Sequence, residues 1–389
     1  MRILHSIRTV NPAGGGPIEG IKQICKVHKA AGRETEIVTL DAPDDPWVKE
    51  CPMPIHALGP VRTKYGYSSK LTPWVAEHRT EYDAIIINGL WQYSGLGVWR
   101  ALHGTDTPYF VFTHGMLDPW FKRAYPLKHL KKWLYGPWGD YRVLRDAAAV
   151  LFTSEEEMRV SRESFWLYRC NGIVVSYGVA NPPENGEAAK QAVLNRFPEL
   201  RGRRVFLFLG RIHEKKGCDL LLRAFAKVAA SDESIRLVFA GPDQTGWVSD
   251  LKALGEKLGI SDRLLWTGMI SGDLKWGMIR LAEVFILPSH QENFGIAVAE
   301  ALACGTPVLI SNKINIWREI EEDGGGIVEN DDLPGTVRLI EKWIALPAQQ
   351  REAMREKALR CFQSRFEVAR AAESIVQVVA KYGKTPAHA

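Results

Sequence analysis

The chain has 389 residues, of which 46% are hydrophobic and 24% charged, and carries a formal net charge of +5. This composition excludes disordered and fibrous proteins and is typical of a globular enzyme. A single hydrophobic core stops growing at roughly 250–300 residues, so the length predicts two domains. The small net charge does not indicate a nucleic-acid partner. The six cysteines lack the spacings of zinc sites or disulfide frameworks, which predicts free thiols in a reducing cytosol.

Ten short apolar runs bounded by Gly, Ser, Asn or Pro predict buried parallel strands. They lie at 2–7, 36–40, 84–89, 109–115, 148–154, 172–178, 204–211, 236–242, 284–289 and 306–311. Segments with helical periodicity, such as 20–32 and 218–230, lie between them. Alternating strands and helices predict an α/β fold with two doubly wound sheets, each of which binds ligands at the carboxyl ends of its strands.

The domain boundary is predicted within 180–204, a stretch rich in Pro, Gly and charge that precedes a new strand. The N-terminal domain is then 1–180 and the C-terminal domain 181–364, and two facing domains would enclose a slot. The last segment, 365–389, begins with a helical apolar stripe formed by Phe366, Ala369, Ala372, Ile375 and Val379. The periodicity does not decide which domain the stripe packs on. Our prediction is that the helix packs back on the N-terminal domain.

Three glycines, Gly14, Gly15 and Gly16, follow the first predicted strand and precede a helix that Pro17 can open. Glycines let the backbone approach a ligand closely, and the N–H groups at a helix N-terminus attract anions. The pattern is not the GxGxxG fingerprint of dinucleotide sites. A plain tight turn therefore remains the alternative to a ligand-binding loop.

The segment 120–138 interleaves basic and aromatic side chains. The basic residues are Lys122, Arg123, Lys128, Lys131 and Lys132, and the aromatic ones are Trp120, Phe121, Trp133, Tyr135 and Trp138. This pattern is typical of a segment that lies on anionic lipid, and equally of a solvated basic helix with buried aromatic residues. No stretch approaches the roughly 18 consecutive apolar residues that span a bilayer, and the N-terminus lacks the features of a signal peptide. We expect a cytoplasmic protein, with contact to the inner face of the membrane under the first interpretation.

Arg211 and Lys216 follow the strand predicted at 205–209 and precede an amphipathic helix. Two cations in a strand-to-helix loop suit a diphosphate, because Arg grips phosphate oxygens bidentately and Lys adds a point charge. The alternative is a solvated basic loop, which is the interpretation that we adopt for Lys215.

Glu292 and Glu300 stand eight positions apart in SHQENFGIAVAEALACGTPVLIS, which begins at residue 289. If a helix starts near Asn293 or Gly295, the two carboxylates lie roughly 12 Å apart along its axis. Carboxylate pairs that hydrolyse glycosides lie about 5–9.5 Å apart, so these two are expected to hold opposite ends of one elongated ligand. The backbone N–H groups of Asn293, Phe294 and Gly295 would bond hydroxyl or phosphate oxygens. The alternative is that Glu292 complements the helix dipole and Glu300 forms a surface salt bridge.

The ordered set of motifs resembles the signature of retaining GT-B glycosyltransferases of family 4. Glu292, seven intervening residues and Glu300 stand between LPS and ALACGTPV, after the cations in GRIHEKKG, AGP at 240–242 and WTG at 266–268. The resemblance covers nearly the whole chain. It implies the GT-B fold, which consists of two facing Rossmann-like domains with a cleft between them.

The resemblance also implies a role for each matching position. Glu300 would bind the ribose hydroxyls and Glu292 the donor sugar, while Arg211 and Lys216 would clamp the diphosphate. The backbone would complete the donor site at Gly15, Gly16, Met269, Ile270, Asn293, Phe294 and Gly295. His114, in FVFTHGMLDPW, matches the family's His-Gly position beside the reacting carbon. A lone His is more often structural, but its place at a strand end favours a functional role.

The implied reaction moves a hexose with retention from a nucleotide-diphosphate sugar, with UDP favoured and GDP admitted. The acceptor would be a hydroxyl of a glycan or lipid-linked molecule in polysaccharide biosynthesis, contacted by Asn88, Trp91 and Tyr67. No side chain is an obvious nucleophile, so the departing phosphate would deprotonate the acceptor. Since no DxD-type triad occurs, we expect neither a metal nor another cofactor. A GT-B nucleotide-sugar epimerase is the alternative, and a basic nucleic-acid-binding protein is the alternative from another class, although no recognised binding module is present.

Overall fold

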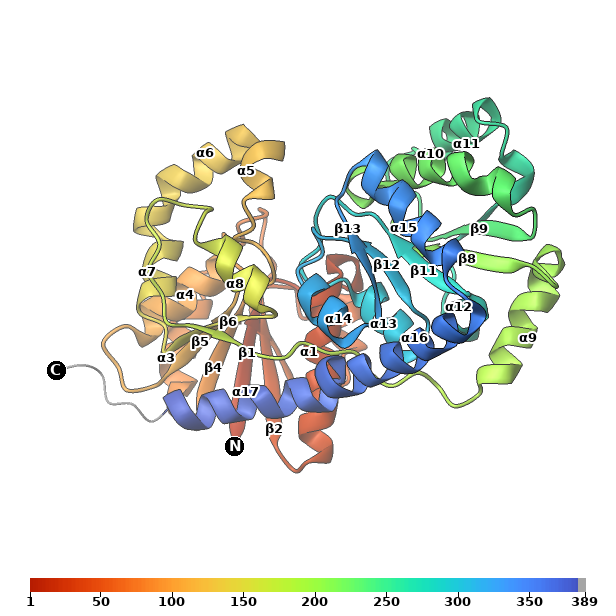
Figure 1. Cartoon of the computed structure of the whole chain (residues 1–389). Coiled ribbons are helices and arrows are strands. Elements are labelled where there is room, and N and C mark those ends of the chain that lie inside the picture. The colour runs from red at the N-terminus through yellow and green to blue at the C-terminus, as the bar shows by residue number, and fades with distance from the viewer. Residues whose placement is uncertain (384–389) are drawn as a thin grey trace. The chain divides into compact units, whose positions relative to one another are not determined.

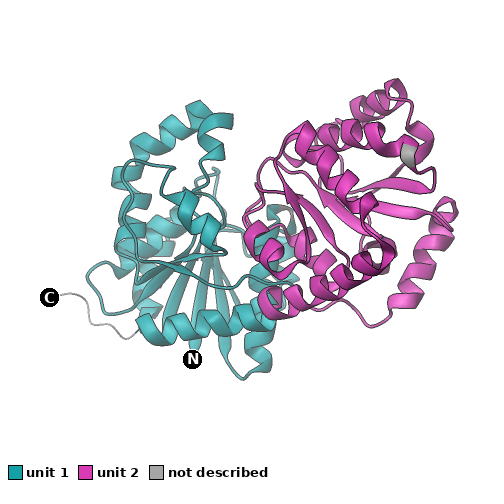
Figure 2. Ribbon diagram, in the orientation of Figure 1, with its two compact units in different colours: residues 1–180, 368–389 teal, residues 181–367 magenta. Residues whose placement is uncertain are grey.

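The computed structural model describes residues 1–383, apart from the side chains of residues 13 and 231, and divides into two compact units (Figures 1 and 2). Unit 1 comprises Met1–Ala180 and the chain from Val368 onward, and unit 2 comprises Asn181–Glu367. The first division falls where the sequence predicts it. The second lies three residues beyond the expected end at 364. Residues 384–389 of the predicted terminal segment lie outside the described residues.

Unit 1 is built on a sheet of seven parallel strands in the order β3-β2-β1-β4-β5-β6-β7. The strands are β1 (Arg2–Ile7), β2 (Glu34–Thr39), β3 (Ile55–Ala57), β4 (Ala84–Asn88), β5 (Tyr109–Phe112), β6 (Ala149–Phe152) and β7 (Gly172–Val174). Every residue of β4, β5 and β6 is buried, because a parallel sheet is covered on both faces by its connecting helices. The winding reverses between β1 and β4, which is where open α/β sheets bind ligands.

The helices of unit 1 cover this sheet and extend beyond its carboxyl edge. They are α1 (Gly16–Ala30), α2 (Pro46–Lys49), α3 (Leu71–His78), α4 (Tyr93–Leu102), α5 (Trp120–Ala124), α6 (Pro126–Tyr135), α7 (Asp140–Arg145), α8 (Glu155–Ser161) and α17 (Val368–Tyr382).

The terminal helix α17 packs on α1 in unit 1 (Figure 1). The His28 ring and the Ala372 carbonyl share a hydrogen bond of 3.1 Å, and Arg33 forms an ion pair with Glu373 at 2.9 Å. The predicted stripe is wrong at its start, because the extended backbone of Glu367 separates Phe366 from the helix. Ala369 is exposed. The buried face of α17 is formed by Val368, Ala371, Ala372, Ile375 and Val379.

Unit 2 contains six parallel strands in the order β10-β9-β8-β11-β12-β13. They are β8 (Arg204–Leu209), β9 (Ile235–Ala240), β10 (Leu264–Gly268), β11 (Val284–Leu287), β12 (Val308–Ser311) and β13 (Gly326–Glu329). The helices are α9 (Gly186–Arg196), α10 (Cys218–Val228), α11 (Val248–Lys257), α12 (Gly272–Leu281), α13 (Ile296–Ala303), α14 (Trp317–Asp323), α15 (Leu333–Ala345) and α16 (Ala348–Cys361). The winding reverses between β8 and β11, so the loops after these strands are the place to look for a ligand site.

Candidate functional site

The loops that follow β8 and β11 are tied together at the carboxyl edge of the unit 2 sheet. The Lys215 carbonyl accepts hydrogen bonds from the Ser289 hydroxyl at 2.9 Å and from the His290 N–H at 2.8 Å. Gly217 has a φ of 68°, and a Cβ at this position would lie 2.3 Å from the Pro288 carbonyl oxygen. Only glycine therefore allows the two loops to approach this closely.

Lys216 and Glu292 form an ion pair between these two loops. The two side chains are only 14% and 15% exposed. Because burying an unpaired charge costs free energy, each side chain stabilises the charge of the other. The Ser289 hydroxyl lies 3.5 Å from the same Glu292 oxygen. The structure thus places the predicted diphosphate cation and the predicted sugar carboxylate in direct contact.

Glu292 lies in an extended segment before α13. Its N–H donates to the Lys313 carbonyl at 2.9 Å, and its carbonyl accepts from the Asn315 N–H at 3.1 Å. Gly295 then takes a left-handed conformation, and the helix begins at Ile296. The estimate of roughly 12 Å assumed a helix from near Asn293 or Gly295. The helix begins only at Ile296, so the three residues after Glu292 do not follow the helical rise, and the separation stays a prediction.

Glu300 projects from α13 toward α12, where Lys275 donates to it at 2.7 Å. Glu300 is 13% exposed and Lys275 is 25% exposed. This is a largely enclosed pair, unlike the surface salt bridge of the alternative interpretation. The sequence analysis did not identify Lys275, since a single lysine on an amphipathic helix carries no signal until its partner is known.

The remaining donor-site positions of unit 2 present backbone or exposed side chains. The Phe294 side chain is buried edge-on against Phe366 with ring centres 5.6 Å apart, which leaves only its backbone for a ligand. Arg211 is exposed and donates to the Gln244 side chain at 3.3 Å. Met269, directly after β10, is 75% exposed, and Ile270 beside it is half-buried.

His114 follows β5 in unit 1 with a φ of 48°, a conformation that side-chain-bearing residues rarely adopt. Its ring stacks on Phe112 with centres 4.7 Å apart, and its Nε2 lies 3.1 Å from Asn88 Oδ1. Burial lowers the pKa of His114 to about 3, so the imidazole is neutral at pH 7. The Asn88 amide donates to the Ile86 carbonyl at 3.0 Å, which turns its oxygen toward His114 and makes Nε2 the donor.

Glu157 accepts hydrogen bonds from the residues on both sides of His114. One carboxylate oxygen accepts from the Thr113 hydroxyl at 2.6 Å and the Gly115 N–H at 2.7 Å, and the other accepts two bonds of 2.7 Å from Thr153. The side chain is 2% exposed. The sequence analysis did not identify Glu157. In the sequence, Ser154 and Glu157 form the capping-box pattern of a helix start at α8. This pattern does not indicate a functional site.

Two family models match the chain. "Glycosyl transferase 4-like domain" matches residues 15–178, and "Glycosyl transferases group 1" matches residues 192–360. The chain belongs to the group 1 glycosyltransferases.

Individual relatives agree with the family assignment of this glycosyltransferase. A GDP-mannose:cellobiosyl-diphosphopolyprenol alpha-mannosyltransferase of Xanthomonas oryzae is 27% identical over 380 residues, which cover 94% of this chain and 93% of the relative. The sucrose-phosphate synthase of Thermosynechococcus elongatus superposes with a TM-score of 0.76 at 20% identity, covering 98% and 99% of the two chains. Anabaena HepE in complex with UDP and glucose superposes with a TM-score of 0.75 at 17% identity, covering 98% and 100%. Each unit of the glycosyltransferase is a Rossmann-like α/β domain, as the GT-B fold requires.

The predicted acceptor residues of the glycosyltransferase occupy different environments. Asn88 is 3% exposed and bonded to His114, so we reassign it from acceptor contact to orienting that ring. Trp91 packs against Phe165 with ring centres 4.9 Å apart and is partly covered. Tyr67 is 60% exposed and keeps a free ring surface.

The glycine loop of the glycosyltransferase lies after β1, at the winding reversal of unit 1. Gly16 is the first residue of α1, so Pro17 is the second helical residue rather than the first. Gly15 has a φ of 81°, and a Cβ added there would meet no atom within 4 Å. Its N–H donates to the Pro12 carbonyl at 3.0 Å, which forms the tight turn of the alternative interpretation. The open space beside Gly15 also leaves room for a ligand.

The basic aromatic segment of the glycosyltransferase forms α5, α6 and a short 3-10 turn, Gly136–Trp138. No residue of α6 is buried, and large apolar side chains on this segment are exposed. The exposed fractions are 76% for Leu127, 52% for Leu130, 41% for Trp133, 60% for Leu134 and 72% for Trp138. The interpretation with buried aromatic residues is therefore wrong for these tryptophans. Among residues 1–383, no helix is long and apolar enough to cross a membrane.

Proposed function

We propose that this glycosyltransferase moves a hexose from a nucleotide-diphosphate sugar to a hydroxyl of a lipid-linked or other glycan acceptor, with retention of configuration. The observation that carries the proposal is the pair of enclosed lysine–carboxylate contacts, Lys216–Glu292 and Lys275–Glu300, near the carboxyl edge of the unit 2 sheet. In the motif that carries the family resemblance, Glu292 corresponds to the residue for the donor sugar and Glu300 to the residue for the ribose.

Donor binding exchanges partners within these pairs. The diphosphate brings negative charge to Lys216, whose ammonium then bonds phosphate oxygens in place of Glu292. Glu292 is thereby released to accept hydrogen bonds from sugar hydroxyls, and Glu300 accepts from the ribose. Arg211 adds a second cation to the diphosphate. The first turn of α13 supplies the positive end of a helix dipole after Gly295.

The transfer needs no protein nucleophile. The bond between the anomeric carbon and the diphosphate breaks, and the acceptor oxygen bonds to that carbon on the same face. The acceptor proton passes to the departing phosphate oxygen. Lys216 and Arg211 stabilise the charge that develops on the diphosphate, so we propose a reaction that needs no metal ion. His114 is neutral and donates from Nε2 to Asn88, so its Nδ1 is the atom that accepts a hydrogen bond from the reacting sugar, in a contact made mainly in the transition state.

Relatives frame the choice of donor and acceptor. The Xanthomonas relative is named for GDP-mannose and for a cellobiosyl-diphosphopolyprenol acceptor, whereas the Anabaena structure contains UDP and glucose. We propose a UDP- or GDP-hexose as donor and a saccharide on a lipid diphosphate as acceptor, in the synthesis of a polysaccharide. The exposed leucines and lysines of α6 then bring the protein to an anionic membrane surface, where such an acceptor resides.

A stability-shift screen across UDP- and GDP-hexoses tests the donor proposal. A ligand at 100 times its dissociation constant adds about 2.7 kcal/mol to the free energy of unfolding, so the true donor should stand out. The best donor is then incubated with a lipid-linked saccharide in the presence of a chelator, and NMR of the product reports the anomeric configuration. Release of a free epimerised sugar without transfer would overturn the proposal in favour of the epimerase. Inversion, or a requirement for metal, would overturn the mechanism.

A further inference from the structure

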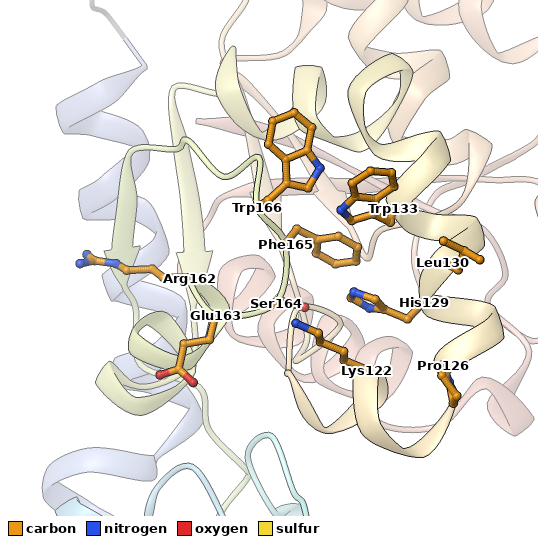
Figure 3. Close-up of a pocket in the computed structure, with 10 residues that line it drawn as sticks. All are labelled: Lys122, Pro126, His129, Leu130, Trp133, Arg162, Glu163, Ser164, Phe165 and Trp166. Carbon is orange, nitrogen blue, oxygen red and sulfur yellow. The ribbon is translucent and has the colours of Figure 1, made fainter.

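A groove of about 690 Å³ lies in unit 1 between α6 and the segment that follows α8. Figure 3 shows aromatic side chains from the two segments lying beside one another and lining the groove together. The His129 ring stacks on Phe165 with centres 4.5 Å apart, and Trp133 lies 5.9 Å from Trp166. The volume is within the roughly 300–1,000 Å³ of small-molecule sites. The residues named so far for donor binding and chemistry do not line this groove.

The walls of the groove are apolar at neutral pH. Burial, with Lys122 and Lys132 nearby, lowers the pKa of His129, so its ring is uncharged and acts as an aromatic surface. Leu127, Leu130 and Leu134 follow one another at helical spacing along α6, and each is more than half exposed. They extend the apolar surface along the helix.

Positive charge is confined to one end of the groove. Lys122 points into the groove, whereas Arg162 points away from the aromatic side chains (Figure 3). Glu163, the acidic residue of the lining, is paired with Arg159 at 3.1 Å. A cation beside an apolar channel is complementary to a ligand with an anionic head and a hydrocarbon chain.

We propose that this groove seats the hydrocarbon chain of a lipid diphosphate, the carrier part of the acceptor, with Lys122 beside the diphosphate. The inference rests on the proposed function in that the acceptor is lipid-linked. A saccharide needs hydrogen-bonding partners around its ring, but Figure 3 shows the polar side chains of the lining on the side away from Trp133 and Trp166. A hydrocarbon chain matches the aromatic walls and needs no such partners.

The test is a calorimetric titration of the full-length protein with farnesyl diphosphate below its micelle-forming concentration. Trp166 is 67% exposed and lines the groove, so Trp166→Ala should leave the fold intact and weaken binding at least about tenfold. Trp138 is 72% exposed and does not line it, so Trp138→Ala is the matched control and should change affinity less than about twofold. Lys122→Ala should weaken binding of the diphosphate, with Lys131→Ala as its control.

The outcomes separate this inference from the proposed function. Equal losses in the Trp166 and Trp138 variants would indicate general adhesion of lipid to the surface and overturn the groove. A saccharide that binds in a Trp166-dependent way, without competition from farnesyl diphosphate, would also overturn it. If wild-type protein binds a nucleotide hexose but not farnesyl diphosphate, the groove fails and the proposed function stands. If no nucleotide hexose binds, the proposed function itself fails.

Discussion

The loops at the carboxyl edges of the two sheets hold their polar groups in opposite ways. In unit 2, Glu292 and Glu300 are each matched by a lysine, and these charges are available for exchange with a charged ligand. In unit 1, His114 is neutral, and Asn88 and Glu157 are buried in fixed hydrogen bonds. Unit 2 therefore holds paired opposite charges, as the proposed binding of a charged donor requires, whereas unit 1 keeps one ring and its backbone in a set shape.

Replacing Glu292 by Gln should have the largest effect on activity. The variant loses the charged acceptor for the sugar hydroxyls, which lowers kcat about 10²–10³-fold. Lys216 is freed from its partner, so UDP or GDP without a sugar should bind as tightly as before or more tightly. Steady-state kinetics and calorimetry measure the two effects. Glu214→Gln, an exposed glutamate of the neighbouring loop, is the control. Weakened binding of the bare nucleotide would contradict the exchange of partners.

The next largest effect should follow from His114→Asn. Asn tolerates the left-handed backbone at this position, so the change removes the imidazole while sparing the loop. Turnover should fall about 100-fold, as for the loss of one preorganised hydrogen bond in the transition state, while the donor dissociation constant stays unchanged. His103→Asn, at an exposed histidine of the same unit, should do neither. A change in donor affinity equal to the change in turnover would place His114 in donor binding instead.

Glu157→Gln tests whether that carboxylate positions His114. The amide cannot accept all four hydrogen bonds, so kcat should fall about tenfold with the donor KM unchanged, and stability should fall by about 1–3 kcal/mol. Thr153→Val is the matched control, because it removes one bond to the other oxygen and leaves the contacts beside His114 intact. It should lower stability alone. Equal losses of kcat in both variants would mean that Glu157 is merely structural.

Glu300→Ala should weaken nucleotide binding about tenfold, since a charged hydrogen-bond acceptor is lost. The ribose contact can be isolated with a 2′-deoxynucleotide. Wild-type protein should discriminate against it, and the variant should bind both nucleotides alike. Discrimination that survives in the variant would refute the ribose assignment.

The smallest effect concerns pH. His290 lies 3.0 Å from Asp331, and this hydrogen bond raises the pKa of His290 above its usual 6.5. A raised pKa stabilises the fold fully below the unfolded-state value, and the contribution is lost as pH rises through the folded-state value. The difference in Tm between wild type and Asp331→Asn should thus be larger at pH 5.5 than at pH 8.5. Both side chains are partly exposed, so the corresponding difference in the free energy of unfolding should be less than about 1 kcal/mol. Equal differences at both pH values would contradict the linkage.

Most of the fold could be predicted, and the strands that were missed share one physical cause. The ten predicted strands correspond to β1, β2, β4 to β9, β11 and β12. The three that the sequence analysis missed, β3, β10 and β13, each lie at an edge of a sheet. Edge strands are covered less completely, and no residue of these three is fully buried. Without an unbroken apolar run, they carry no distinct strand signal.

The site shows the same limit in another form. Spacing and residue type were enough to single out Glu292, Glu300 and Lys216. Lys275 and Glu157 could not be found this way, because the residues that they contact are distant in the chain. Lys275 contacts Glu300, and Glu157 contacts Thr113. The Asn88 amide suits a sugar by its chemistry, but only the structure shows that it is already hydrogen-bonded to Ile86 and His114.

The return of the chain to unit 1 has a consequence for biosynthesis. Unit 2 is one continuous stretch, so it can fold as soon as Glu367 has left the ribosome. Unit 1 is synthesised first but is completed last, because α1 lacks its cover until α17 emerges. The Val368 N–H bonds the Val179 carbonyl at 3.0 Å, so the first residue of the returning chain joins the last residues of the outgoing one. The face of α1 that α17 covers therefore stays uncovered in the nascent protein while nearly two hundred further residues are made.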